Sequence, residues 1–332
     1  MLNRKFAVPL LAVLPFVVAL ACMGIGRYPI PFVTTVRALL SPLTGVQVAA
    51  TDSAVLFSIR LPRLLLALSV GMGLSVAGAA FQSVFSNPLA TPDTLGVASG
   101  ASFGAALGLI LKANLLVVQG LALAMGILAL AITYWISRKN GKVSIIAVVL
   151  SGMVISSLFQ ALVSFIKVIA DPQDTLPSIT YWLMGSMAGA TYPGLALGLP
   201  FIFIGSLMIF LLRWRLNVIA LSEDEAQALG SRLKVVRILI MGSATLVTAS
   251  CVSMCGQVSW IGLLMPHVAR LVCGSDNAKI VPVSMSFGAV FMVLVDTIAR
   301  SVSASEIPLS ILTAIIGAPL FVGLLRKMGG VR

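Results

Sequence analysis

Residues 61–83 read LPRLLLALSVGMGLSVAGAAFQS, and no charged side chain interrupts them after Arg63. A membrane-spanning helix needs about 20 mostly apolar residues to cross a hydrocarbon core about 30 Å thick. Backbone groups in lipid must be hydrogen-bonded within their own segment, so we expect this run to be a helix. Ser69, Gly73 and Ala77 recur every fourth residue, and such small faces let neighbouring helices approach closely in lipid.

The rest of the chain repeats this pattern, and we draw ten apolar runs in all. They cover residues 6–26, 61–83, 94–111, 115–136, 144–167, 194–212, 236–255, 258–271, 280–299 and 308–325. Hydrophobic residues make up 59% of the chain and charged residues only 10%, whereas soluble domains carry about 25% charged residues. The runs are continuous and do not alternate, which argues against a β-barrel. The sequence therefore predicts an all-α, polytopic membrane protein with about ten transmembrane helices, as a single transmembrane domain over residues 1–332.

The charges in the loops predict the orientation. The first run also fits a signal peptide, but it is long enough to span and further runs follow, so we interpret it as a retained helix. With the N-terminus inside and ten spans, only seven of the 22 lysines and arginines fall outside: Arg27, Arg37, Arg60, Arg63, Lys112, Lys167 and Arg300. The inner excess agrees with the positive-inside rule. We expect a multi-pass protein of the cytoplasmic (inner) membrane with both termini cytoplasmic.

The stretch 178–190 is apolar too, but we do not count it as a span. A span there would move the basic cluster between Arg213 and Arg237 to the outer side. Its length and its Tyr181-Trp182 pair suit a helix at the membrane interface better.

Several function classes are disfavoured by the composition. The net charge of +12 does not indicate nucleic acid, because the basic residues sit in short loops and form no stripe. The only Gly-Lys pair, Gly141-Lys142, lacks a phosphate-binding loop around it. His267 is the only histidine, and Cys251 and Cys255 lie one helical turn apart in an apolar run, so packing is the favoured interpretation of both. We expect no cofactor, no metal site and no enzymatic activity in this chain.

The fifth run carries a polar stripe. Gly152, Ser156, Gln160 and Ser164 recur at four-residue spacing, so they share one face of a helix. That face either hydrogen-bonds to another helix or lines a water-filled path. An unpaired glutamine amide near mid-span is costly, and the residues alone leave both interpretations open.

Three outer arginines are candidates for a docking site. Arg60 and Arg63 flank Leu61-Pro62, which we take as the start of the second span because proline suits a first helical position. Cations at a helix N-terminus oppose the helix dipole, so we expect them to be there for an acidic partner outside the membrane, or to anchor lipid phosphates. Arg300 lies at the outer end of the ninth span, where the dipole favours it.

The inner loop after the sixth run reads LSEDEAQALGSRLK over residues 221–234. Ser222 and Glu225 have the spacing of a capping box, and Gly230 can end the helix that they start. A short capped helix on the cytoplasmic face predicts either a contact with another subunit or a solvated loop.

The motifs together resemble a known family. They are Arg60-Leu-Pro-Arg63, Gly78-Ala-Ala-Phe-Gln82, Asn87-Pro-Leu-Ala90, Leu95-Gly96, Tyr181-Trp-Leu-Met-Gly-Ser186, Ala228-Leu-Gly230, Gly256-Gln-Val-Ser-Trp-Ile-Gly-Leu263, Pro266-His-Val-Ala-Arg270, Asp296-Thr-Ile-Ala-Arg300, Glu306-Ile-Pro308 and Thr313-Ala-Ile-Ile-Gly-Ala-Pro-Leu-Phe321. Their order over residues 56–327 resembles the FecCD-type permeases, which import ferric siderophores, haem and cobalamin. Trp260 and Ser310 depart from the usual family residues.

The resemblance implies a permease subunit that moves its cargo by alternating access. Two ATP-binding subunits would dock on the cytoplasmic face, at the residues that match the family's coupling loop: Ser222, Glu225, Ala226, Leu229 and Gly230. A soluble substrate-binding protein would dock outside on Arg60, Arg63 and Arg300. A second permease copy or homologue would complete a central path lined by Ser156, Gln160 and Ser164, all within membrane lipid. A ferric siderophore is the leading cargo, ahead of haem, cobalamin and an oxyanion such as molybdate.

The alternative is a self-sufficient secondary transporter or channel. That class depends on ionisable residues buried in mid-span. The predicted spans offer essentially Asp296, and it lies near an outer end.

Overall fold

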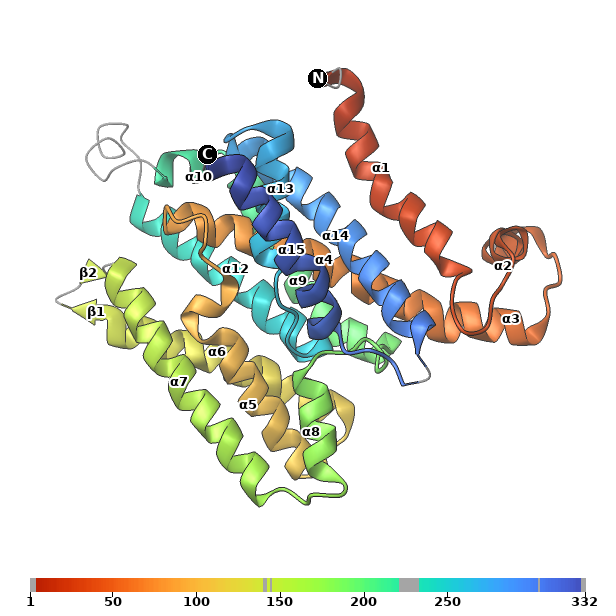
Figure 1. The fold of residues 1–332 in the computed structure, drawn as a ribbon, viewed down its shortest axis with the longest axis horizontal. Coiled ribbons are helices and arrows are strands. Elements are labelled where there is room, and N and C mark those ends of the chain that lie inside the picture. The colour runs from red at the N-terminus through yellow and green to blue at the C-terminus, as the bar shows by residue number, and fades with distance from the viewer. Residues whose placement is uncertain (1–3, 140–141, 144, 221–232, 304, 330–332) are drawn as a thin grey trace.

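Helices make up nearly all of the described chain in this computed structural model (Figure 1). The structure describes residues 4–139, 142–143, 145–220, 233–303 and 305–329. The elements in chain order are α1 (Arg4–Met23), α2 (Phe32–Thr44), α3 (Ala50–Ala54), η1 (Val55–Arg60), α4 (Leu61–Val84), η2 (Pro92–Leu95), α5 (Val97–Ile110), α6 (Leu115–Ser137), β1 (Arg138–Lys139), β2 (Lys142–Val143), α7 (Ile145–Ile169), α8 (Thr175–Leu183), α9 (Tyr192–Leu211), α10 (Arg215–Ile219), α12 (Leu233–Cys255), α13 (Ile261–Cys273), α14 (Asn277–Val302) and α15 (Leu309–Gly329).

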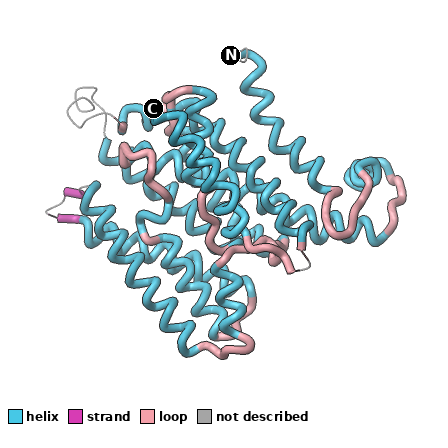
Figure 2. Tube along the Cα trace, viewed as in Figure 1, coloured by secondary structure: helices cyan, strands magenta, loops and turns pink. Residues whose placement is uncertain are grey.

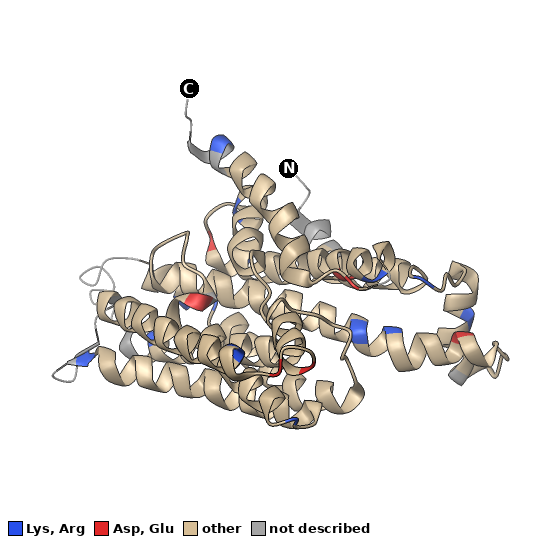
Figure 3. Ribbon diagram, turned by 60° about the horizontal axis from the view of Figure 1, so that its bottom comes forward, with Lys and Arg blue, Asp and Glu red and all other residues tan. Residues whose placement is uncertain are grey.

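Each of the ten predicted runs coincides with one of these helices, and the prediction of an all-helical polytopic membrane protein is confirmed. Within the described residues, six helices are long and apolar enough to cross a membrane, and shorter apolar helices accompany them. Figure 3 shows long helical stretches without any charged residue. In Figure 2 the loops are short, and the only extended pair drawn is the antiparallel hairpin of β1 and β2, in which Arg138 pairs with Val143.

The predicted start of the second run at Leu61 is wrong. The helix runs without interruption from Ala50 through α3 and η1 into α4, a span of 35 residues. η1 is a π-helix that ends at Arg60, directly before Pro62. Proline inside a helix removes one backbone hydrogen bond and crowds the preceding turn, and a wider π turn accommodates it. Arg60 and Arg63 therefore lie inside a long helix and not at an N-terminus, so the argument from an opposing dipole does not apply.

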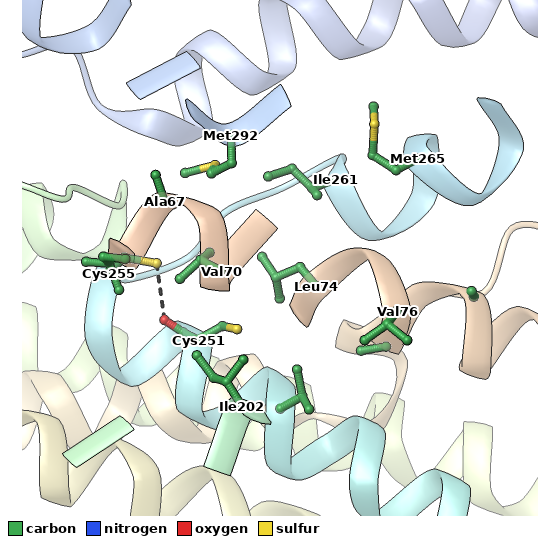
Figure 4. Packing of buried hydrophobic residues seen from close by; sticks show 14 of the residues in the cluster. Ala67, Val70, Leu74, Val76, Ile202, Cys251, Cys255, Ile261, Met265 and Met292 are labelled. Carbon is green, nitrogen blue, oxygen red and sulfur yellow. Dashed lines mark hydrogen bonds between the residues drawn. The ribbon is translucent and has the colours of Figure 1, made fainter. Parts of the chain in front are cut away.

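Helix α4 forms the centre of the molecule. Figure 4 shows Val70 and Leu74 of α4 between Cys251 of α12 on one side and Ile261 of α13 on the other. Its glycines explain this close packing: a Cβ at Gly78 would overlap the carbonyl oxygen of Gly262 in α13. Most residues of α4 are buried, so it contacts protein and not lipid on nearly all sides.

Helices α5, α6 and α7 form a second group beside this core (Figure 1). The small face predicted for the third run packs closely on α6, since a Cβ at Gly100 or Gly104 would meet backbone atoms of Met125 or Leu121. Helix α8 follows α7 and has nine residues. At about 1.5 Å per residue it is too short to cross the membrane, in agreement with the prediction that residues 178–190 do not form a span.

Candidate functional site

The chain leaves helical geometry between α12 and α13, which the sequence did not predict as a special feature. Gly256 and Trp260 both have positive φ angles, +74° and +71°. The first suits glycine, whereas a positive φ is rare for a tryptophan and costs free energy. Irregular backbone inside a membrane protein is tolerated where it is buried in protein or lines a water-filled cavity. The break between these two helices therefore marks a place where function is to be sought.

Three of the sequence motifs meet at this break. The backbone N–H of Ser186 donates to the carbonyl of Cys255 at 2.8 Å, and the N–H of Leu309 donates to Gly185 at 2.9 Å. Ser310 donates to the carbonyl of Met184 through its hydroxyl at 2.7 Å. Motifs more than 50 residues apart in the chain thus satisfy one another's backbone groups.

The Trp260 side chain closes one side of the break. Its ring lies edge-on to Phe321 of α15, with 6.1 Å between ring centroids. A Cβ at Gly317 would come within 2.9 Å of the Trp260 Cβ atom. His267 also packs edge-on against Phe321 and its Nδ1 lies 2.8 Å from the carbonyl of Leu263, which fits the structural role expected for it.

A pocket of about 230 Å³ opens beside the break. It is lined by Leu74, Thr91, Asp93, Ala98, Thr248, Val252, Gln257, Val258, Ser259, Trp260, Gly262 and Leu263. The lining comes from α4, the η2 loop, α5, α12, the irregular segment before α13 and the first turn of α13. It mixes apolar side chains with a few polar ones, as small-molecule sites do.

Asp93 is the acidic residue of this pocket, and sequence reasoning missed it. Asp93 is exposed and is one of the residues that line the pocket, and desolvation by the surrounding protein raises the pKa of its carboxyl group. A signal was present in the sequence, because Asp93 is the single acidic residue between Asp52 and Asp171.

The polar stripe on α7 lies next to the same loop. A Cβ at Gly152 would come within 2.9 Å of the Cα of Leu95 in η2. Ser156 is half-buried, whereas Gln160 and Ser164 are exposed in this single chain. The Gln160 amide reaches the Ser99 hydroxyl of α5 at 3.5 Å, a long contact that leaves most of its hydrogen-bonding capacity free for other partners.

The three predicted docking arginines are brought together at one end of the molecule, but all three are buried, with 5–7% of each residue exposed. Arg60 donates to the carbonyls of Met23, at 2.8 Å, and Tyr28. Arg300 donates to the carbonyl of Cys22 at 2.7 Å. The C-terminal end of α1 and the segment after it thus supply the acceptors for both guanidinium groups.

Two carboxylates complete this arginine cluster. Arg63 pairs with Asp296 at 2.8 Å and with Glu306 at 2.6 Å. Asp296 is fully buried and also lies 3.6 Å from Arg300. The cluster of Arg60, Arg63, Arg300, Asp296 and Glu306 joins α4, α14 and the entrance to α15, and it carries one more positive than negative charge.

The predicted coupling residues Ser222, Glu225, Ala226, Leu229 and Gly230 lie outside the described residues. Their role stays a prediction, as do the docking role of the arginines and the path role of the α7 stripe.

Comparison with known proteins places the fold and the motifs in a wider group. A sequence profile of the FecCD transport family matches residues 13–327. The molybdate import system permease protein MolB of Haemophilus influenzae is 39% identical over 96% of this chain and 94% of its own. The iron(3+)-hydroxamate import system permease protein FhuG of Bacillus subtilis is 36% identical over 87% of this chain and 90% of its own.

A solved structure is similar along the whole chain. It is described as an inward-facing conformation of a putative metal-chelate type ABC transporter, with 37% identity and a TM-score of 0.88. The similarity covers 98% of this chain and 100% of the other.

Proposed function

This chain belongs to the FecCD transport family and is a permease subunit of a metal-chelate-type ABC importer, and from that premise we propose that it carries a ferric chelate across the membrane by alternating access. The chain is not itself an ATPase; in an ABC importer, ATP is hydrolysed on separate subunits, and a binding protein delivers the cargo. The observation that carries the proposal is the polar pocket at the helix break, which adjoins the polar face of α7.

The path would run along that face of α7. Ser156, Gln160 and Ser164 follow one another along the helix, and the η2 loop with the pocket lies beside its inner half. A second permease copy or homologue would supply the opposite wall, because the stripe is uncovered in one chain. Membrane lipid surrounds the remainder of this single transmembrane domain, residues 1–332.

The partners would occupy opposite ends. Two ATP-binding subunits would dock on the cytoplasmic face at residues 222–230, and the soluble binding protein would dock outside on the arginine cluster. Acidic residues of that protein would meet the excess positive charge of the cluster. Glu306, with 25% of its side chain exposed, would then give up part of its ion pair with Arg63 to an acidic residue of the binding protein. In this proposed arrangement, both termini would lie in the cytoplasm.

Import by the reconstituted complex tests the proposal. Proteoliposomes that contain this chain with its ATPase should accumulate a ferric chelate only when ATP and the loaded binding protein are both present. Accumulation without ATP would favour the secondary-transporter alternative.

An oxyanion is the second candidate cargo, because the MolB relative is named for molybdate import. The ligand that the binding protein retains through purification shows whether the cargo is a ferric chelate or an oxyanion. Retained molybdate and no uptake of ferric chelates would overturn the cargo proposed here.

A further inference from the structure

Asp93 differs from the other acidic residues that the structure describes, because no hydrogen-bond donor or cation among the described residues contacts its carboxylate. Asp52 accepts from Tyr28 at 2.8 Å, and Asp174 lies 3.4 Å from Lys112. Asp276 pairs with Asn217 and Lys279. Within the described chain, no lysine or arginine lines the pocket that Asp93 faces.

A structural role does not account for this carboxylate. Asp93 lies in the first turn of η2, where an acidic side chain can cap a helix, but η2 has only four residues and its N-cap residue is Thr91. Asp93 is exposed and lines the pocket, so its carboxylate is open to whatever the pocket holds. Its partner is therefore to be sought in what enters the pocket.

Polar groups connect the pocket with the face of α7. Gln257, in the irregular segment, donates to the Ser102 hydroxyl of α5 at 2.9 Å. One turn earlier on α5, Ser99 meets Gln160 of α7. The hydroxyls of α5 thus link the pocket lining to the stripe that is proposed as the path.

We propose that Asp93 is a charge-selecting residue on the translocation route, which admits neutral or cationic metal chelates and disfavours free oxyanions. The inference rests on the proposed function and names the cargo class for it. A carboxylate in a site partly shielded from water repels an anion strongly. Three hydroxamate groups, each with one negative charge, neutralise Fe³⁺, so a ferric trihydroxamate has no charge of its own and becomes cationic with a free amine.

Thiol chemistry tests the charge of the pocket without any cargo. Ser259 lines the pocket and is exposed there, so Ser259→Cys can be made in a chain whose four cysteines are replaced. In the assembled complex, Cys at 259 should react faster with a cationic methanethiosulfonate (trimethylammonium) than with an anionic one (sulfonate). Asp93→Asn, which keeps size and shape, should reduce the ratio of the two rates about tenfold.

The matched control is Asp174→Asn, an exposed carboxylate in the loop before α8, and it should leave the ratio unchanged. Equal rates for both reagents with Asp93 present would overturn the proposal, and so would a Cys at 259 that reacts with neither. Thermal unfolding in detergent checks that each variant is folded, and a Thr91→Cys version, whose residue also lines the pocket, provides the same measurement if Ser259→Cys does not fold.

Transport separates this inference from the proposed function. Asp93→Asn should raise ATP-driven uptake of molybdate relative to ferrioxamine B, a cationic ferric trihydroxamate. If neither cargo moves with ATP while the thiol ratio depends on Asp93, the proposed function fails and the charged pocket stands. If both cargoes move with ATP and residue 93 alters neither their ratio nor the thiol ratio, only the present inference fails.

Discussion

At the scale of single residues, the buried arginine cluster holds together segments that are far apart in the chain. Asp296 lies between Arg63 and Arg300 with none of its surface exposed. Removing one member of a buried ion pair leaves its partners without a counter-charge, which costs about 3–5 kcal/mol. We expect Asp296→Asn to lower the stability of the purified permease by that order, measured by thermal unfolding in detergent.

A matched control uses a surface pair. Asp174 and Lys112 are both largely exposed, and such pairs contribute little. The Asp174→Asn variant should have a melting temperature close to that of the unmodified protein. Equal melting temperatures of the Asp296→Asn and Asp174→Asn variants would mean that the cluster does not stabilise the fold.

Docking of the binding protein is also a question of single residues, and burial changes how it should be tested. Arg63→Glu would place a third carboxylate beside Asp296 and Glu306, so loss of import could reflect misfolding. Arg60 has only backbone carbonyls as hydrogen-bond partners. Arg60→Gln should therefore keep the permease folded and weaken binding-protein affinity about 5- to 10-fold at low salt, with a smaller effect at high salt.

Arg37, exposed on α2, gives the comparison for that variant. If Arg37→Gln weakens binding as much as Arg60→Gln, the effect belongs to the general positive charge of this end and not to the cluster. Binding is measured between the purified binding protein and the permease complex in detergent or nanodiscs.

At the scale of helices, glycines at crossings determine how closely α4 packs. A Cβ at Gly78 would overlap backbone atoms of Gly262, whereas a Cβ at Gly120 of α6 would have nothing within 4 Å. Backbone atoms cannot move aside as a flexible side chain can. Overpacking therefore lowers the free energy of unfolding by about 1–3 kcal/mol. Gly78→Ala should lower the melting temperature clearly, and Gly120→Ala should not. A Gly78 variant as stable as the parent would show that this crossing is looser than described.

The stripe on α7 can be tested helix face by helix face. Cysteines at positions 156, 160 and 164 should react with a water-soluble thiol reagent in the assembled complex, and reactivity should change when ATP is trapped. Leu158 is exposed as well in the single chain, but it points about 160° away from Gln160, and a cysteine there should face lipid and react far less. Equal labelling of positions 158 and 160 would return the stripe to a packing role.

At the scale of the whole molecule, ATP must be coupled to the path through the cytoplasmic loops. A cysteine at Ala226 should crosslink to the ATP-binding subunit in membranes that contain the complex. Arg138, exposed at the start of the hairpin and also predicted to be cytoplasmic, gives the comparison site. Crosslinking only from position 138 would move the coupling contact from residues 222–230 to the hairpin.

Much of this architecture follows from local properties of the sequence. Hydropathy over about 20 residues decides whether a segment enters lipid, so the helices at all ten apolar runs could be predicted, although their ends shifted by several residues. The amphipathic helix α2 and the extension of α4 back to Ala50 were missed, because neither is a continuous apolar run and Pro62 resembled a helix start. The family could be recognised because its motifs are linear.

Only the tertiary structure decided which polar groups meet. Arg63 and Asp296 are 233 residues apart, and no local pattern indicates that a buried carboxylate will neutralise an arginine that was expected to face a partner. The pocket of Asp93 likewise needs a loop, a helix break and α4 to come together in space. Apolar periodicity acts along the chain, whereas ion pairing and desolvation depend on distances through space, which the sequence alone does not contain.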